Sequence, residues 1–83
     1  MATMPVGEWY RAFGTTSPQN YFEVARQGED GRLLVRHFQY DSRFRRVLRS
    51  SDHYVEEREW LDLLVANDIV RVERDRVSFL MPM

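Results

Sequence analysis

The 83-residue sequence predicts an α+β fold, in which a small antiparallel sheet of four to five strands carries one main helix and ends in a C-terminal β-hairpin. Three observations predict it. Residues 21–26 and 32–40 are rich in aromatic and β-branched side chains and flank a glycine-containing turn, which is typical of a hairpin. Residues 53–66 repeat apolar side chains at helical spacing. Residues 69–81 contain two further short alternating stretches, so helix and strand signals mix along a chain that is long enough for one domain.

Residues 1–7 are predicted to form a flexible lead-in, and a single domain is predicted over residues 8–83. Residues 8–13 place Trp9, Tyr10 and Phe13 close together, which suits a short strand or a first turn. The glycine, serine and proline of residues 14–18 predict a loop.

The clearest hairpin follows. In residues 21–26, Phe22 and Val24 alternate with Tyr21 and Glu23, so the two pairs are expected on opposite faces. Residues 28–31 supply glycines that tolerate a positive φ in the turn. The return strand, residues 32–40, is apolar on both sides, which predicts a central strand covered on each face.

Residues 41–50 allow two interpretations. In the first, Ser42 caps a short helix in which Phe44, Val47 and Leu48 share a face. In the second, residues 41–42 form a turn and residues 43–49 form another strand. The helix is slightly favoured on spacing.

The main helix is predicted over about residues 53–66, with Asp52 or Ser51 accepting an N-terminal amide hydrogen bond. Helical spacing directs Trp60, Leu61 and Leu64 toward the sheet. Asn67 suits a left-handed residue at the helix end.

Residues 69–73 and 76–81 are then predicted to form the second hairpin, with its turn at residues 74–75. The alternation of apolar side chains in both stretches supports this pairing.

Charge is segregated along the chain, although the net charge is only -1. All twelve basic residues are arginines, and six of them fall within residues 32–49 against a single acid, whereas both flanking segments are acidic. Charge runs of this kind often neutralise each other within a fold. The alternative is a basic surface that meets an acidic partner.

Several classes of function are disfavoured by composition. There is no cysteine, which excludes disulfides and thiolate metal sites. His37 and His53 are the only histidines and lack metal-ligand spacing, and no serine lies in a nucleophile motif, so no enzyme activity, metal or cofactor is expected. No apolar run is long enough for a membrane span, and the first twenty residues show no signal-peptide pattern, so a cytoplasmic location is expected.

Nucleic-acid binding is the second function considered, because arginines alternate with aromatic residues in the basic segment. From Glu56 onward, a helix is followed by residues 69–72 and then residues 76–79. This order resembles the last helix and wing of winged-helix domains, over about a third of the chain. The resemblance implies a DNA- or RNA-binding regulator, but its recognition helix would carry four acids against Arg58, which repels phosphate.

Protein binding is the favoured interpretation, since arginine and aromatic residues are enriched in interface hot spots. The chain is therefore predicted to be a small non-catalytic binding module, such as an accessory subunit, adaptor or inhibitor. Its partner would be an acidic protein surface or a second copy of the chain. The partner-binding residues predicted on the basic segment are Arg36, Tyr40, Arg43, Arg45, Arg46 and Arg49.

Overall fold

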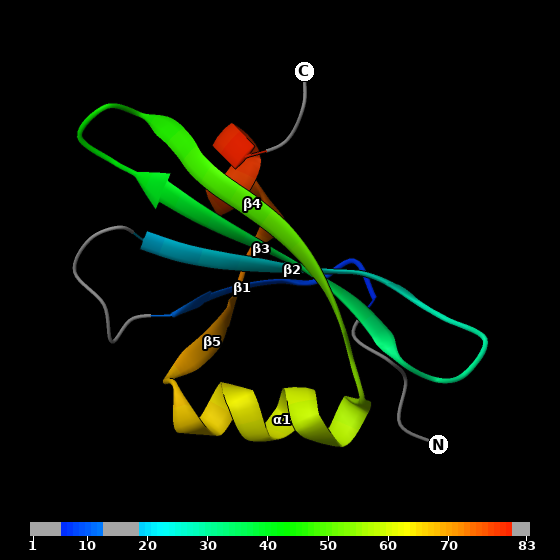
Figure 1. Ribbon diagram of the computed structural model, residues 1–83. Helices are drawn as coiled ribbons and strands as arrows, with labels where there is room; N and C mark the ends of the chain where they lie inside the picture. Colours follow the sequence, from blue (N-terminus) through cyan, green and yellow to red (C-terminus); the bar gives the residue numbers. More distant parts are fainter. Residues whose placement is uncertain (1–5, 13–18, 81–83) are drawn as a thin grey trace.

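A computed structural model describes residues 6–12 and 19–80 of the chain. It contains a five-stranded antiparallel sheet with the order β4-β3-β2-β1-β5, one α-helix and one 3₁₀ segment, as Figure 1 shows. This arrangement confirms the α+β class. In chain order the elements are β1 (Trp9–Ala12), β2 (Gln19–Gln27), β3 (Leu33–Asp41), β4 (Arg46–Val55), α1 (Glu57–Ala66), β5 (Ile69–Val72) and η1 (Arg74–Leu80).

The first predicted hairpin is confirmed. β2 and β3 pair antiparallel, with Phe22 opposite His37 and Val24 opposite Val35. Gly31 closes the turn at a φ of 86°, a backbone conformation that glycine adopts without strain. β3 lies between β2 and β4, and the sheet is covered by α1 on one face and by η1 on the other, which explains why the residues of β3 are apolar on both sides.

Each face of the sheet carries its own hydrophobic cluster. The buried residues on the side of α1 are Tyr10, Ala12, Val24, Leu33, Val35, Trp60 and Ile69. Those on the opposite side, where η1 packs, are Trp9, Tyr21, Val77 and Leu80. A sheet covered on both faces can bury more apolar surface, which matters in a domain this small.

Trp60 attaches α1 to the sheet. Its side chain is only 2% exposed, and its ring packs edge-on to Tyr10 with a centroid distance of 5.3 Å. The centroid of the Phe22 ring, on the neighbouring strand β2, lies 5.8 Å from that of Trp60. Aromatic pairs at these separations add to the free energy gained from burial alone.

The connections of α1 dictate where it lies. It links β4 at one edge of the sheet to β5 at the other, so it crosses the strands at one end of the sheet (Figure 1). Its ten residues span about 15 Å, close to the roughly 19 Å across five strands. β3 and β4 are about 30 Å long and extend well past a helix about 10 Å across.

The favoured helix within residues 42–49 is wrong, and the strand alternative is closer to the structure. Residues 42–45 form the turn, with Arg45 at a φ of 52°, and β4 starts at Arg46. Val47 pairs with Tyr40, and Arg49 with Gln39. This pairing satisfies backbone groups of β3 that a short helix would leave without partners.

The predicted start of the main helix is also wrong. Residues 53–55 belong to β4, where Val55 pairs with Leu33. Asp52 and Ser51 do not cap the helix, because both lie within β4, and the Asp52 carboxylate accepts a hydrogen bond from Arg36. The helix begins after Glu56, whose backbone N–H donates to the Glu59 carboxylate at 3.3 Å.

Two of the three predicted helix contacts agree with the structure. Trp60 is buried and Leu64 packs against the core, but Leu61 is 51% exposed. The helix therefore meets the sheet along a narrower stripe than the sequence predicts.

The C-terminal hairpin is not formed. β5 pairs with β1, with Val70 opposite Arg11, and η1 replaces the predicted last strand. Val77 and Leu80 of η1 are buried, and the backbone kinks at Val77, whose φ of -120° and ψ of 17° are not helical. The helix-and-wing order that resembles a winged-helix domain therefore lacks its wing hairpin.

Some expectations fall on other parts of the chain. Residues 1–5 of the lead-in, Phe13, the loop at residues 14–18 and Met81 lie outside the described residues. Gly7 of the lead-in donates a backbone hydrogen bond to the Val24 carbonyl at 2.7 Å. Hydrogen bonding to the sheet thus begins at Gly7, two residues before β1.

The left-handed residue after α1 is Asp68 rather than Asn67. Asn67 has a φ of -118°, whereas Asp68 has a φ of 51°. A β-carbon disfavours this conformation, and the negative charge lies near the negative end of the helix dipole.

We therefore expect Asp68→Gly to raise the free energy of unfolding by about 0.5–1 kcal/mol, measured by urea denaturation. As a control, Asp62→Gly within α1 is expected to lower it by about 0.3 kcal/mol, because glycine is a poorer helix former than aspartate. A loss of stability in Asp68→Gly would contradict the proposed strain at this position.

Candidate functional site

The turn between β3 and β4 presents a basic and aromatic surface, here called the arginine tip (Arg43, Phe44, Arg45 and Arg46). The Phe44 ring is 67% exposed. The guanidinium carbons of Arg43 and Arg46 lie 5.9 and 5.7 Å from its centroid. These cation–π contacts keep two positive charges beside an apolar ring that has little other covering.

Asp41 organises the backbone of the arginine tip. Asp41 is only 8% exposed. Its carboxylate accepts hydrogen bonds from the backbone N–H groups of Arg43 at 2.9 Å and Phe44 at 3.4 Å. Hydrogen bonds from backbone amides to a carboxylate two residues earlier are characteristic of tight turns. The tip is therefore held in one shape by a group beneath it.

The other predicted binding residues lie elsewhere. Arg36 is on the η1 side of the sheet, where its Nε donates to Asp52 at 2.9 Å and a terminal nitrogen lies 3.9 Å from Glu23. The hydrogen bond from Arg36 lowers the pKa of Asp52. Arg36 is thus paired with acids of this chain.

Tyr40 is also on the η1 side. Its ring packs against Phe79 at 4.6 Å and against Tyr21 at 6.4 Å. Its ring is therefore engaged in packing within the chain and does not join the arginine tip.

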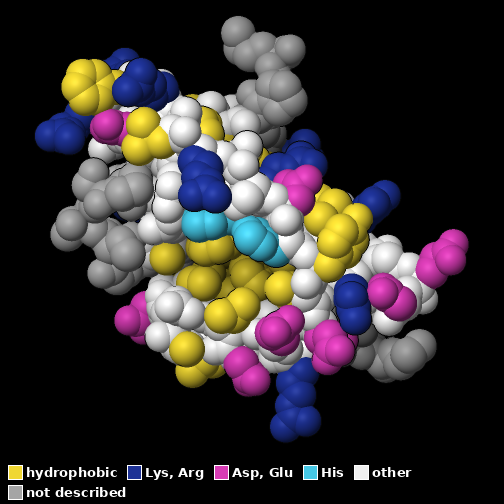
Figure 2. All heavy atoms as spheres, in the orientation of Figure 1, with side chains coloured by type: hydrophobic (Ala, Val, Ile, Leu, Met, Phe, Trp, Pro, Cys, Tyr) yellow, Lys and Arg dark blue, Asp and Glu magenta, His cyan; other side chains and the backbone are white. Residues whose placement is uncertain are grey.

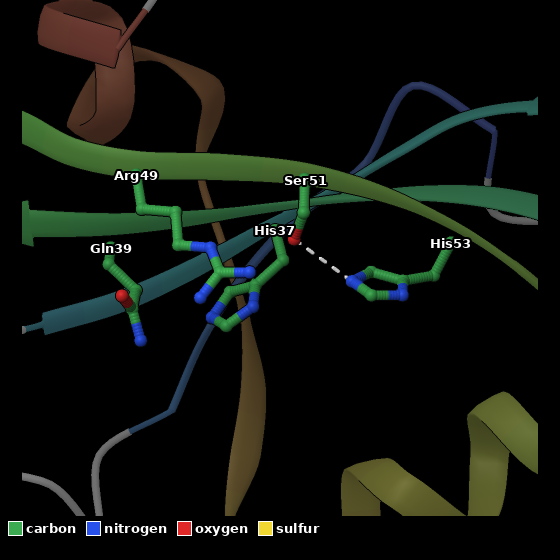
Figure 3. Close-up of a pocket in the computed structure, with 5 residues that line it drawn as sticks. All are labelled: His37, Gln39, Arg49, Ser51 and His53. Atoms are coloured by element: carbon green, nitrogen blue, oxygen red, sulfur yellow. Dashed lines mark hydrogen bonds between the residues drawn. The ribbon is translucent and has the colours of Figure 1, made fainter.

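Arg49 belongs to a third location, on the side of the sheet that carries α1. It lines a hollow of about 210 Å³ together with His37, Gln39, Ser51 and His53. Figure 3 shows these five side chains projecting from β3 and β4 to the same side, with the Arg49 guanidinium directed toward His37. The predicted arginine strip is therefore divided among three surfaces.

Sequence reasoning missed this helix-side group as a site. Its members occur at alternate positions, His37 and Gln39 on β3 and Arg49, Ser51 and His53 on β4. Alternation on paired strands places side chains on one face. The signal was present but required β4 to be recognised as a strand.

His37 is held firmly in this group. Its ring stacks on Phe22 with a centroid distance of 4.6 Å, and its Nε2 lies 2.8 Å from the Asn20 side-chain oxygen. That oxygen can only accept, so Nε2 carries the hydrogen. Burial lowers the pKa of His37, and the neighbouring His53 and Arg49 lower it further.

A second hollow lies on the η1 side of the sheet. It measures about 570 Å³ and is lined in part by Trp9, Glu23, Arg36 and Arg74. Two of its charged side chains, Arg36 and Glu23, already lie 3.9 Å apart as an ion pair. The charge that it offers to a ligand is correspondingly reduced.

Two structural features are absent from residues 6–12 and 19–80. No group of three or more side chains in this part of the chain is placed to hold a metal ion. No helix here has the length and apolar character needed to cross a membrane.

The position of His37 generates a pH prediction. We expect NMR titration to give His37 a pKa below 6.5, the ordinary value, and Arg49→Gln to raise it. Because the folded state binds this proton less readily than the unfolded state, His37 should make the free energy of unfolding fall as the pH drops below about 6.5. His37→Gln should remove that contribution, and a His37 pKa at or above 6.5 in the folded protein would contradict the burial argument.

Comparison of the chain with protein-family models, with curated proteins and with solved structures gave no match.

Proposed function

We propose that this protein is a small non-catalytic binding module that docks on an acidic protein surface through the arginine tip. The observation that carries the proposal is the 67% exposed Phe44 ring between the guanidinium groups of Arg43 and Arg46. Aromatic and arginine side chains dominate the binding energy of many interfaces. The partner would use carboxylates, and the expected setting is the cytoplasm.

The shape of the arginine tip supports docking on a macromolecule. The tip stands at the end of two strands that extend past α1, and residues 42–50 are all exposed. Asp41 holds the tip backbone, so less conformational entropy is lost when a partner binds. Clustered arginines also steer an acidic partner during encounter, which raises the association rate.

Self-association is the second candidate. β4 is an edge strand whose residues are exposed except for Ser51 and Val55, and its free backbone groups could pair with another strand. The outer surface of α1 offers Glu59 and Asp62, with Glu56 just before the helix, around a shallow hollow that Arg58 also lines. The arginine tip of one copy could meet this acidic surface of another.

Nucleic-acid binding is a weaker alternative. The arginine tip could place Phe44 against a base and its arginines against phosphates. The chain as a whole has a net charge of -1, however, and α1 is acidic on its outer surface. Nucleic-acid affinity depends on net neutralisation of phosphates, which this distribution does not favour.

The test is capture of partner proteins from extract of the native host by immobilised protein, followed by affinity measurement with the purified partner. We expect the triple variant Arg43→Ser, Arg45→Ser, Arg46→Ser to weaken binding at least tenfold, because it removes the three charges of the tip. The free energy of unfolding should change by less than about 1 kcal/mol, since these side chains are exposed.

The matched control replaces Arg58, Arg74 and Arg76, which are exposed elsewhere, with serine. This variant has the same net charge as the first and should retain most of the affinity. Equal losses in both variants would show that net charge alone matters. Unchanged binding in the tip variant would refute the assignment of the site.

Two measurements separate the other candidates. Light scattering of the purified protein reports self-association, which the tip variant should abolish if the tip contacts α1 of another copy. Fluorescence anisotropy with labelled RNA and DNA over a salt series reports nucleic-acid binding. A submicromolar signal that falls steeply with salt would favour nucleic acid over protein.

A further inference from the structure

Three adjoining hollows form one continuous groove between α1 and the sheet. Their volumes are about 210, 250 and 290 Å³, and His37 lines all three. Figure 2 shows both histidines side by side above a depression floored by hydrophobic side chains. The groove exists because α1 covers only one end of the strands.

One end of the groove is polar and basic. The Arg49 guanidinium, the His37 and His53 rings, and the Ser51 hydroxyl project into the first hollow (Figure 3). Arg49 makes no ion pair within the described residues, unlike Arg36 on the other face. No described residue that lines the three hollows is acidic, so an anion placed here meets positive charge without a competing carboxylate.

The other end of the groove is apolar. It is walled by the sheet on one side and by α1 on the other. The described residues that line this part include Phe22, Val35, Val55, Trp60 and Leu63. Leu63 is 38% exposed, so part of this apolar surface faces solvent when the groove is empty. Covering such surface is worth roughly 25 cal/mol for each Å² removed from water.

We propose that this groove binds a medium-chain monocarboxylate, with the carboxylate at Arg49 and His37 and the hydrocarbon chain along Phe22, Trp60 and Leu63. Charge complementarity identifies the head group, because a guanidinium donates two parallel hydrogen bonds to a carboxylate. The apolar walls of the groove identify the rest of the ligand as a hydrocarbon chain. This function goes beyond docking by the arginine tip and does not depend on it, since none of the four tip residues lines the groove.

The dimensions favour a small molecule over a protein segment. The hollows are at or below the lower end of the range for drug-sized ligands, and two of them are bounded by both the helix and the sheet. A single carboxylate satisfies Arg49 and reaches His37, whose Nδ1 becomes a donor when the ring is protonated. Ser51 and His53, joined by a 2.9 Å hydrogen bond, lie beside them.

The experiment titrates octanoate into ¹⁵N-labelled protein and follows amide and Trp60 indole resonances by NMR. We expect saturable shifts at His37, Arg49, Trp60 and Leu63. Arg49→Gln should weaken binding roughly tenfold, because it removes a charge-assisted hydrogen-bonding group. Arg43→Gln is the matched control, since it removes the same charge at the tip and should leave the octanoate affinity unchanged.

The neutral analogue 1-octanol should bind at least severalfold more weakly than octanoate. Equal binding of both would overturn the assignment of the anionic end. Absence of saturation by about 10 mM octanoate would overturn the proposal as a whole. Neither outcome bears on the arginine tip, because the tip is tested with a protein partner.

A pH series tests the role of His37. The ionisable groups that face His37 are Arg49 and His53 from β4. The polar groups beside it are Ser51, Gln39 and Asn20, and α1 contributes only apolar side chains to the hollows that it lines. Octanoate remains ionised between pH 6 and 8, while a bound carboxylate favours protonated His37. The affinity of the protein for octanoate should therefore rise as the pH falls from 8 to 6. His37→Gln should flatten this pH dependence. An unaltered dependence in that variant would remove His37 from the site.

Discussion

The packing of Trp60 between Tyr10 and Phe22 is the interaction on which the rest of the molecule depends. It holds α1 across one end of the sheet, while the chain passes from edge strand β4 to edge strand β5. A ten-residue helix spans most of the width of five strands but is too narrow to cover their length. β3 and β4 therefore extend beyond the helix. The arginine tip and the polar end of the groove lie on that extension, and the apolar end of the groove lies between α1 and the sheet.

These two surfaces differ in shape and therefore in the partners that suit them. The arginine tip is convex and has no walls, so Phe44 can be desolvated only by a surface large enough to cover it. The groove is bounded by strands and helix and can enclose most of a small molecule. Arg43 and Arg49 are close in the sequence, yet strand geometry assigns them to these separate surfaces.

Local sequence patterns account for the parts of the fold that were predicted correctly. Alternation and turn residues define the β2–β3 hairpin, and helical spacing identifies Trp60 as a core residue. β4 could not be distinguished from a helix in this way, because Phe44, Val47 and Leu48 also have helical spacing. The deciding interactions are non-local: the pairing of β3 with β4, and the contact of Arg36 with Asp52. The clustering of arginines pointed to the tip, but only strand pairing separates Arg36 and Arg49 from it.

The position of α1 on the sheet is tested most directly by a nuclear Overhauser spectrum of the protein in solution, read at the Trp60 indole. We predict cross-peaks from its ring protons to those of Tyr10 and Phe22, together with contacts between Tyr40 and Val47 across the β3–β4 pair. Cross-peaks from Trp60 to Phe38 or Phe79, which lie on the opposite face, would contradict the position of α1 and the groove beneath it.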